Sequence, residues 1–284
     1  MANGPAPDST VRLLALDADG TLVDPTGEIR PAVRDAIARA RSRGLLVMVC
    51  TGRRYRTARP LLEQLDLEGP VVLHNGVLIK DARSGETTAD LFLPPDLFAP
   101  AMEIMRGDAP PLVYVDQFFD GIDLYAEPRN RCHEFQAEYL ESNPEVVKEV
   151  DSVSQPPSES VVMISSMADE VTLLKLKQRV ETRLGAQVQT NFIMNKNYRG
   201  HILEVTRAGV NKWLALEQVA TSLGIEKSQI AAIGDDTNDT EMIANAGIGI
   251  AMANAVDEVK AVANWITESN DRDGVARAIE RLLG

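Results

Sequence analysis

Four short polar segments of this sequence carry residue types whose spacing could support chemistry. The first is "DADGTL" at 17–22, in which Asp17 and Asp19 directly follow an apolar run. Side chains alternate along a strand, so both carboxylates can leave its carboxyl end on the same side. Ligands bind at that end of open α/β sheets. A plain polar turn after a strand explains this one segment equally well.

A calcium loop is a third interpretation of this segment, and the spacing argues against it. An EF-hand loop needs glycine at its sixth position. Counted from Asp17, the sixth residue is Leu22, and Gly20 falls at the fourth position. The segment also follows a strand pattern rather than a helix.

The second segment is "TGR" at 51–53, again directly after an apolar run. The Thr51 hydroxyl and the backbone N–H groups around Gly52 can hold phosphate oxygens. Considered alone, an ordinary cap between a strand and a helix explains these residues too.

The third segment contains Lys212, in the first turn of an expected helix. A helix begins with a partial positive charge, so a lysine there indicates an anion nearby. A solvated surface lysine is the common alternative.

The fourth segment is "GDDTND" at 234–239, which combines Asp235, Asp236, Asn238 and Asp239 before another expected helix. Helix capping explains one or two of these residues. So many oxygen ligands indicate a cation, and a small all-oxygen set fits Mg²⁺ better than Zn²⁺. The three histidines of the chain show no zinc spacing.

The elements that must position these segments predict an α/β fold. Short apolar runs alternate with helical patterns at 1–80 and 197–284, which predicts a doubly wound parallel-sheet core. Between them, residues 81–196 show paired strands and adjacent helices, including a helix over 128–141. We therefore expect an α+β domain inserted into the core. Taken together, the four segments then provide a carboxylate nucleophile, a hydroxyl, a lysine and a metal site, as phosphoryl transfer requires.

The composition is that of an acidic globular protein. The 284 residues have a net charge of −13 and are 44% hydrophobic. This charge argues against nucleic acid as a partner, since that needs clustered cations. The sequence lacks an apolar stretch of about 20 residues and a signal-peptide pattern, so no membrane partner is expected. Only Cys50 and Cys132 are present, and a reducing cytoplasm is the expected location.

On these motifs the sequence resembles the haloacid dehalogenase (HAD) superfamily of phosphohydrolases, specifically its Cof-type branch with a large α/β cap. The four segments occur in the family's order, and the inserted domain follows the second motif, as the family's cap does. Further matching segments are "NG" at 75–76, "GIAMANA" at 249–255 and "NDRDGVA" at 270–276. Small departures are Ala18 between the two aspartates and Asp236 beside Asp235, and neither removes a catalytic group.

The resemblance implies a role for each matching residue. Asp17 would be the nucleophile, and Asp19 the acid and base that also binds Mg²⁺ through its backbone carbonyl. Lys212 would neutralise charge. The residues that would hold the substrate are Thr51, Gly52, Arg53 and Asn238, and those that would hold Mg²⁺, directly or indirectly, are Asp17, Asp19, Asp235 and Asp239.

The expected function is therefore a Mg²⁺-dependent phosphatase that hydrolyses small phosphorylated metabolites, with sugar phosphates favoured, through an aspartyl-phosphate. A sugar-phosphate mutase of the same fold and a phosphosugar-binding protein without turnover remain alternatives. A receiver-type signalling domain is disfavoured, because such a module is much shorter and has no inserted domain. The cap contains no motif that identifies the substrate, and the sequence does not predict the oligomeric state.

Overall fold

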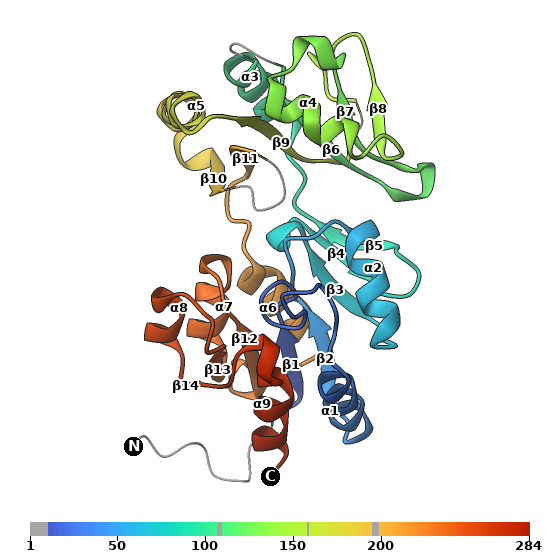
Figure 1. Ribbon diagram of the computed structural model, residues 1–284, viewed down its shortest axis with the longest axis vertical. Coiled ribbons are helices and arrows are strands. Elements are labelled where there is room, and N and C mark those ends of the chain that lie inside the picture. The colour runs from blue at the N-terminus through green and yellow to red at the C-terminus, as the bar shows by residue number, and fades with distance from the viewer. Residues whose placement is uncertain (1–10, 107–109, 158, 195–198) are drawn as a thin grey trace. The chain divides into compact units, whose positions relative to one another are not determined.

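The computed structural model describes residues 11–106, 110–157, 159–194 and 199–284. Their contacts divide the chain into two compact units, which can be followed by colour in Figure 1. One unit contains the described residues up to Asp90 together with Asn211–Gly284, and the other contains Leu91–Val210. The second unit is therefore an insertion in the first.

The first unit is built on a five-stranded sheet in the order β14-β13-β12-β1-β2, in which all neighbours are parallel. Every residue of β1 is fully buried, which explains its continuous apolar sequence. Leu16 lies beside Val49 on one side and Ile233 on the other, so the three central strands end at the same edge. The strands are β1 (Leu13–Leu16), β2 (Leu46–Val49), β12 (Ile230–Gly234), β13 (Ile248–Ala251) and β14 (Trp265–Ile266).

Helices cover both faces of this sheet. Helix α1 connects β1 to β2, which lies on one side of β1 in the sheet. Helices α7 and α8 connect β12 to β13 and β13 to β14, and these strands lie on the other side of β1. Right-handed crossovers that move in opposite directions place their helices on opposite faces. The packing agrees, because α1 contacts α9 and α6 contacts α7. The helices are α1 (Pro31–Ser42), α2 (Tyr55–Gln64), α6 (Lys212–Ser222), α7 (Thr240–Asn245), α8 (Asp257–Val262) and α9 (Gly274–Leu283).

A small antiparallel sheet completes the first unit. It contains β3 (Pro70–Leu73), β4 (Leu78–Asp81) and β5 (Thr87–Asp90), with β4 in the middle. A parallel bridge between Cys50 and Val72 joins β3 to the end of β2. The carboxyl end of β3 therefore lies near the edge at which the central strands end.

The inserted unit is a six-stranded sheet in the order β10-β11-β9-β6-β7-β8, antiparallel except for the pair β7 and β8. Its helices α3 and α5 pack against each other and close a core that includes Phe98, Ile164 and Leu203. The elements are α3 (Pro95–Met105), β6 (Leu112–Gln117), β7 (Ile122–Ala126), α4 (Glu134–Glu141), β8 (Val147–Glu149), β9 (Val161–Ala168), α5 (Glu170–Leu184), β10 (Val188–Met194) and β11 (His201–Arg207).

The predicted fold class, a doubly wound parallel-sheet core with an inserted α+β domain, is confirmed. The units divide after Asp90 and after Val210, whereas the sequence placed these boundaries after residues 80 and 196. The difference has a physical reason at each end. Strand β4 pairs with both β3 and β5, so the hairpin stays whole in the first unit. Strand β11 pairs with β10 and β9, so it belongs to the insertion.

The helix predicted over 128–141 is shorter in the structure. A single 3₁₀ turn spans Arg129–Arg131, and α4 begins only at Glu134. His133 caps this helix, because its Nδ1 accepts a hydrogen bond from the N–H of Phe135 at 3.2 Å. Among the described residues, none of the helices combines the length and apolar character needed to cross a membrane.

Candidate active site

Asp17 and Asp19 both follow β1, but the structure gives them different surroundings. Asp17 is buried, and its Oδ1 lies 2.6 Å from Nζ of Lys212. The side chain of Asp19 is 60% exposed and is held by the guanidinium of Arg53. Arg53 donates to both carboxylate oxygens, from Nε at 2.8 Å and from Nη2 at 2.5 Å. The two carboxylates of one segment are thus paired with two different cations.

Lys212 is the first residue of α6, and its side chain is fully buried. Its Nζ donates to Oδ1 of Asp17 at 2.6 Å and to Oδ1 of Asp239 at 2.7 Å. Asn211 caps the same helix by accepting from the N–H of Leu214 at 2.7 Å. The anion expected beside this helix start is therefore a pair of carboxylates, those of Asp17 and Asp239.

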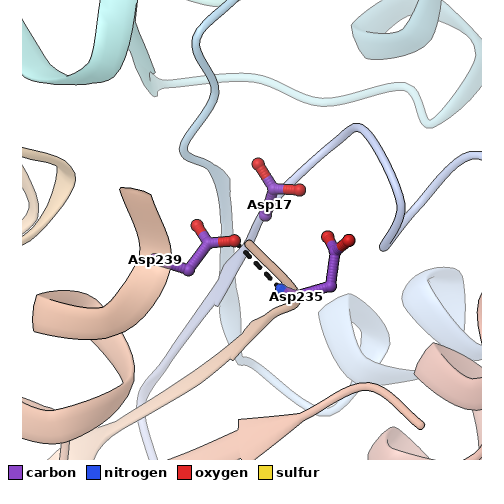
Figure 2. Close-up of side chains that lie close together, drawn as sticks. All are labelled: Asp17, Asp235 and Asp239. Atoms are coloured by element: carbon purple, nitrogen blue, oxygen red, sulfur yellow. Dashed lines mark hydrogen bonds between the residues drawn. The ribbon is translucent and has the colours of Figure 1, made fainter. Parts of the chain in front are cut away.

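Asp239 is held in place from the backbone of its own segment. Its Oδ2 accepts hydrogen bonds from the N–H of Asp235 at 3.0 Å and of Asp236 at 3.2 Å. The first of these is the dashed line in Figure 2. Gly234 permits this arrangement, because a Cβ at that position would lie 2.5 Å from Cγ of Asp239. The turn after β12 therefore holds the Asp239 side chain in place through backbone hydrogen bonds alone.

Asp17, Asp235 and Asp239 form a cluster of carboxylates. One oxygen of each lies within 4.8 Å of the others, and Figure 2 shows the three side chains grouped where two neighbouring strands end. Register explains the meeting, because Leu16 of β1 pairs with Ile233 of β12. Residues far apart in the sequence are brought together by one strand pairing.

The cluster changes the pKa values of its members. Burial raises the pKa of Asp17 well above its usual value; the charge of Asp239 adds to this effect and Lys212 opposes it. Burial also raises the pKa of Asp235 to about 6, although a hydrogen bond from Thr21 opposes the shift. Burial lowers the pKa of Lys212, but Asp17 and Asp239 outweigh it, so that pKa lies above its usual value. The lysine stays charged, while the carboxylates hold more negative charge than it can balance.

This donor set fits a divalent cation that prefers oxygen. Asp17, Asp235 and Asp239 offer only carboxylate oxygens, which are the ligands of Mg²⁺ rather than of softer metals. The raised pKa values of Asp17 and Asp235 indicate negative charge that a cation would stabilise.

Gly20 makes room for the cluster. Its φ of +86° is in the region that favours glycine, and a Cβ would lie 2.1 Å from Oδ2 of Asp235. On the next residue, Thr21 Oγ1 donates to Oδ1 of Asp235 at 2.9 Å. The glycine and threonine of the first motif therefore position the aspartate of the fourth.

Two of the four predicted substrate-binding residues, Gly52 and Asn238, lie beside Asn75, whereas Thr51 and Arg53 have other contacts. Thr51 is buried, and its Oγ1 accepts from the N–H of Arg53 at 3.1 Å. Gly52 and Asn238 both lie beside Asn75: a Cβ at Gly52 would be 3.0 Å from its Oδ1, and Nδ2 of Asn238 donates to the same oxygen at 2.9 Å. The side chain of Arg53 is directed instead to Asp19.

Three further polar residues lie in the site; each belongs to a segment that matches the family, but none was predicted as a catalytic, substrate-binding or metal-binding residue. They are Thr21, Asn75 and Asn254. Asn254 donates from Nδ2 to the carbonyl of Gly20 at 2.8 Å. Asn75 follows β3 and has a left-handed φ of 55°, a strained conformation typical of functional sites. Asn75 and Asn254 both follow the carboxyl end of a strand, the same signal that identified the aspartates.

The comparison with known proteins agrees with this architecture. The family model for haloacid dehalogenase-like hydrolases matches residues 14–279. YxeH of Bacillus subtilis (strain 168) is 32% identical over 277 residues, covering 96% of this chain and 98% of that protein. The 5-amino-6-(5-phospho-D-ribitylamino)uracil phosphatase YwtE of the same organism is 30% identical over 298 residues, covering 96% and 98%.

A solved structure is similar along nearly the whole chain. It is a haloacid dehalogenase-like hydrolase from Bacteroides thetaiotaomicron, 27% identical, with a TM-score of 0.80 over 96% of this chain and 99% of that one. These similarities confirm the predicted superfamily and the predicted enzyme class, phosphoric monoester hydrolase. With a family model that matches from β1 to α9, this chain belongs to the haloacid dehalogenase-like hydrolases.

Proposed function

We propose that this protein is a Mg²⁺-dependent phosphatase that hydrolyses small phosphorylated metabolites through an aspartyl-phosphate on Asp17. One observation carries the proposal: Lys212 Nζ is held between Asp17 and Asp239, 2.6 and 2.7 Å from their oxygens. A carboxylate nucleophile and a phosphoryl group both carry negative charge, so their approach needs a buried cation at this point.

In the first half-reaction, Asp17 attacks the phosphorus. Lys212 occupies Oδ1 of Asp17, so the attack is assigned to Oδ2. A bond forms between Oδ2 and phosphorus while the bond from phosphorus to the ester oxygen breaks. Asp19 gives its proton to the leaving alkoxide, and Thr51 and Gly52 hold the phosphoryl oxygens. When bound by Asp17, Asp235 and Asp239, Mg²⁺ supplies positive charge that stabilises the transferred group.

In the second half-reaction, water releases the phosphate. Asp19, now ionised, takes a proton from the attacking water. The water oxygen forms a bond to phosphorus while the bond between Oδ2 of Asp17 and phosphorus breaks. Inorganic phosphate leaves, and both carboxylates return to their starting forms. Arg53 donates to both oxygens of Asp19, so it orients the ionised carboxylate for this second step.

Sugar phosphates are the favoured substrates. The relative YwtE is named for a compound with a phosphorylated ribityl chain, which supports a polyol or sugar bearing a terminal phosphate. We also propose that the protein works in the cytoplasm. Both of its cysteines are free thiols, as a reducing compartment maintains them.

The test is phosphate release from a panel of sugar phosphates, nucleotides and cofactor phosphates, with Mg²⁺ or with EDTA. The wild-type protein should release phosphate only with Mg²⁺, and reaction in ¹⁸O-labelled water should place the label in that phosphate. A mutase would instead return the phosphoryl group to sugar, without labelled phosphate. No release from any member of the panel would favour the binding protein without turnover.

The nucleophile is tested by Asp17→Asn, which should lower the rate by at least about 10³-fold. Asp35→Asn, on the exposed face of α1, is the matched control and should keep the wild-type rate. A circular-dichroism melt should show both variants folded. More than about one per cent of wild-type activity in Asp17→Asn would contradict the assignment.

A further inference from the structure

The inserted unit contains a cavity of its own, of about 330 Å³. It lies between the end of α3, the start of α4 with the segment before it, the end of β9 and the first two-thirds of α5. Small-molecule sites have volumes of about 300–1,000 Å³. The cavity therefore has room for a small metabolite.

The inner wall of this cavity contains a buried hydroxyl. Ser166 of β9 is only 7% exposed, and its Oγ makes no hydrogen bond within the described part of the chain. Leaving a buried hydroxyl without a partner costs free energy, so such groups normally have one. A polar ligand atom in the cavity would supply it. Next to Ser166 the wall is apolar, with Met105, Leu173 and Leu176.

The outer wall is positive. Lys175 and Arg179 line the cavity from consecutive turns of α5, and no lining residue is acidic. Cations four residues apart on a helix repel each other. The other two cations of α5 that face solvent have partners, because Lys177 pairs with Glu181 and Arg183 with Glu103.

Lys175 and Arg179, by contrast, make no ion pair with any described residue. The acidic residues nearest to them in the sequence are Glu181, which pairs with Lys177, and Glu170, the first residue of α5. The side chains of Lys175 and Arg179 are both exposed on α5, at the rim of a cavity whose inner wall holds the buried Ser166 hydroxyl. An anionic ligand in the cavity would pair with both of them.

We propose that this cavity binds a small organic anion, separately from the aspartate cluster. Its charged end would lie between Lys175 and Arg179. Its apolar body would lie against Leu173 and Met105, and a polar atom of it would accept from the Ser166 hydroxyl. The proposal does not depend on the phosphatase reaction, because all of these residues belong to the inserted unit.

The experiment uses the full chain with ¹³C-labelled methionine methyl groups, because Met105 and Met167 both line the cavity. Their signals are assigned with Met105→Leu and Met167→Leu. The probes are benzoate, benzylphosphonate and the neutral benzyl alcohol, each titrated without Mg²⁺. At least one anion should shift both signals, with a Kd of about 1 mM for a probe of this size, and benzyl alcohol should bind at least tenfold more weakly. Comparing the two anions distinguishes a carboxylate from a phosphate ligand.

Two variants provide the matched comparison. Lys175→Ala combined with Arg179→Ala should weaken binding at least tenfold, whereas Lys177→Ala on the same helix should leave it unchanged. Both changes are at exposed or half-buried positions of α5, so folding should be retained. The proposal is overturned if neither anion shifts Met105 and Met167 up to about 10 mM. It is also overturned if benzyl alcohol binds as well as the anions, or if the double variant binds them normally.

Discussion

Lys212 and Asp17 are 195 residues apart in the sequence, yet their side chains form a buried ion pair with an Nζ–Oδ1 distance of 2.6 Å. The same Nζ also reaches Asp239 at 2.7 Å. Lys212 therefore stabilises both the proposed nucleophile and the carboxylate cluster around it. Without it, two buried carboxylates would face each other with no cation from the chain between them.

We expect Lys212→Met to destabilise the protein by about 3 kcal/mol at pH 8, because removing one partner leaves buried charges uncompensated. Chemical denaturation measures this difference. Phosphatase activity should be lost as well. Lys227→Met, which removes an exposed pair with Glu217, is the control and should cost about 1 kcal/mol or less. Equal stability of Lys212→Met and the wild type would show that the ion pair does not hold the site together.

The affinity for Mg²⁺ should depend on pH through Asp235, whose pKa is raised to about 6 by burial. The metal needs the ionised carboxylate, so protons compete with it. Below about pH 6, the affinity should fall about tenfold per pH unit for each proton released. Calorimetric titration between pH 5 and pH 7.5 measures the slope. Because Thr21 opposes the shift, Thr21→Val should move the midpoint to higher pH; an unmoved midpoint would contradict this cause.

The raised pKa of Asp235 should also make the stability of the metal-free protein depend on pH. A carboxyl group whose pKa is higher in the folded than in the unfolded state binds its proton more tightly when folded. The contribution of Asp235 to the free energy of unfolding is fully present below its pKa in the unfolded chain, near 4. It is lost as the pH rises through its pKa in the folded protein, about 6. Asp17 has a shift of the same sign. Added Mg²⁺ should therefore raise the melting temperature more at pH 7.5 than at pH 5.

Gly20→Ala should displace Asp235, because a Cβ at Gly20 would lie 2.1 Å from its Oδ2. We expect Mg²⁺ affinity to fall at least about tenfold and stability to fall by about 1–3 kcal/mol. Gly27→Ala is a close control. Its φ of +85° is almost the same, but nothing lies within 4 Å of the added Cβ. Backbone strain should therefore be similar in the two variants, and equal Mg²⁺ affinities would mean that the contact with Asp235 is unimportant.

Arg53→Gln separates two roles for the arginine of the second motif. Arg53 donates to both oxygens of Asp19, so in the variant the proposed acid and base loses its orientation. We therefore expect the variant to have a kcat lower by about 10–100-fold and a shifted pH profile. A higher KM with unchanged kcat would mean that Arg53 binds the phosphate directly instead. Arg59→Gln, which removes an exposed pair with Glu63, should leave both constants unchanged.

The sequence was sufficient to predict those features that follow from strand ends. Asp17, Thr51 and Asp235 each come directly after a buried apolar run, and the parallel pairing of β1, β2 and β12 brings those ends to one edge. The alternation of strands and helices likewise predicted the doubly wound core. These are local patterns whose spatial consequence is fixed by general rules of sheet topology.

What depended on tertiary contacts could not be predicted in this way. The hydrogen bonds from Arg53 to Asp19 and from Asn238 to Asn75 are set by side-chain directions after folding. The limits of the insertion were displaced because β11 has the apolar pattern of a core strand, yet it pairs with β10 and β9. An apolar run shows that a strand is buried, but not which sheet buries it.

The position of β1 has a consequence for synthesis of the protein on the ribosome. Its neighbour β2 follows soon after it, but the motif that joins it on the other side comes much later: Thr21 and its partner Asp235 are 214 residues apart. At translation rates of about 5–20 residues per second, one edge of β1 stays unpaired for about 10–40 s until β12 has been made. The inserted unit is translated during that interval. The central sheet of a nascent chain is therefore completed only after the inserted unit has been made, and chains that stop before β12 would expose an aggregation-prone edge.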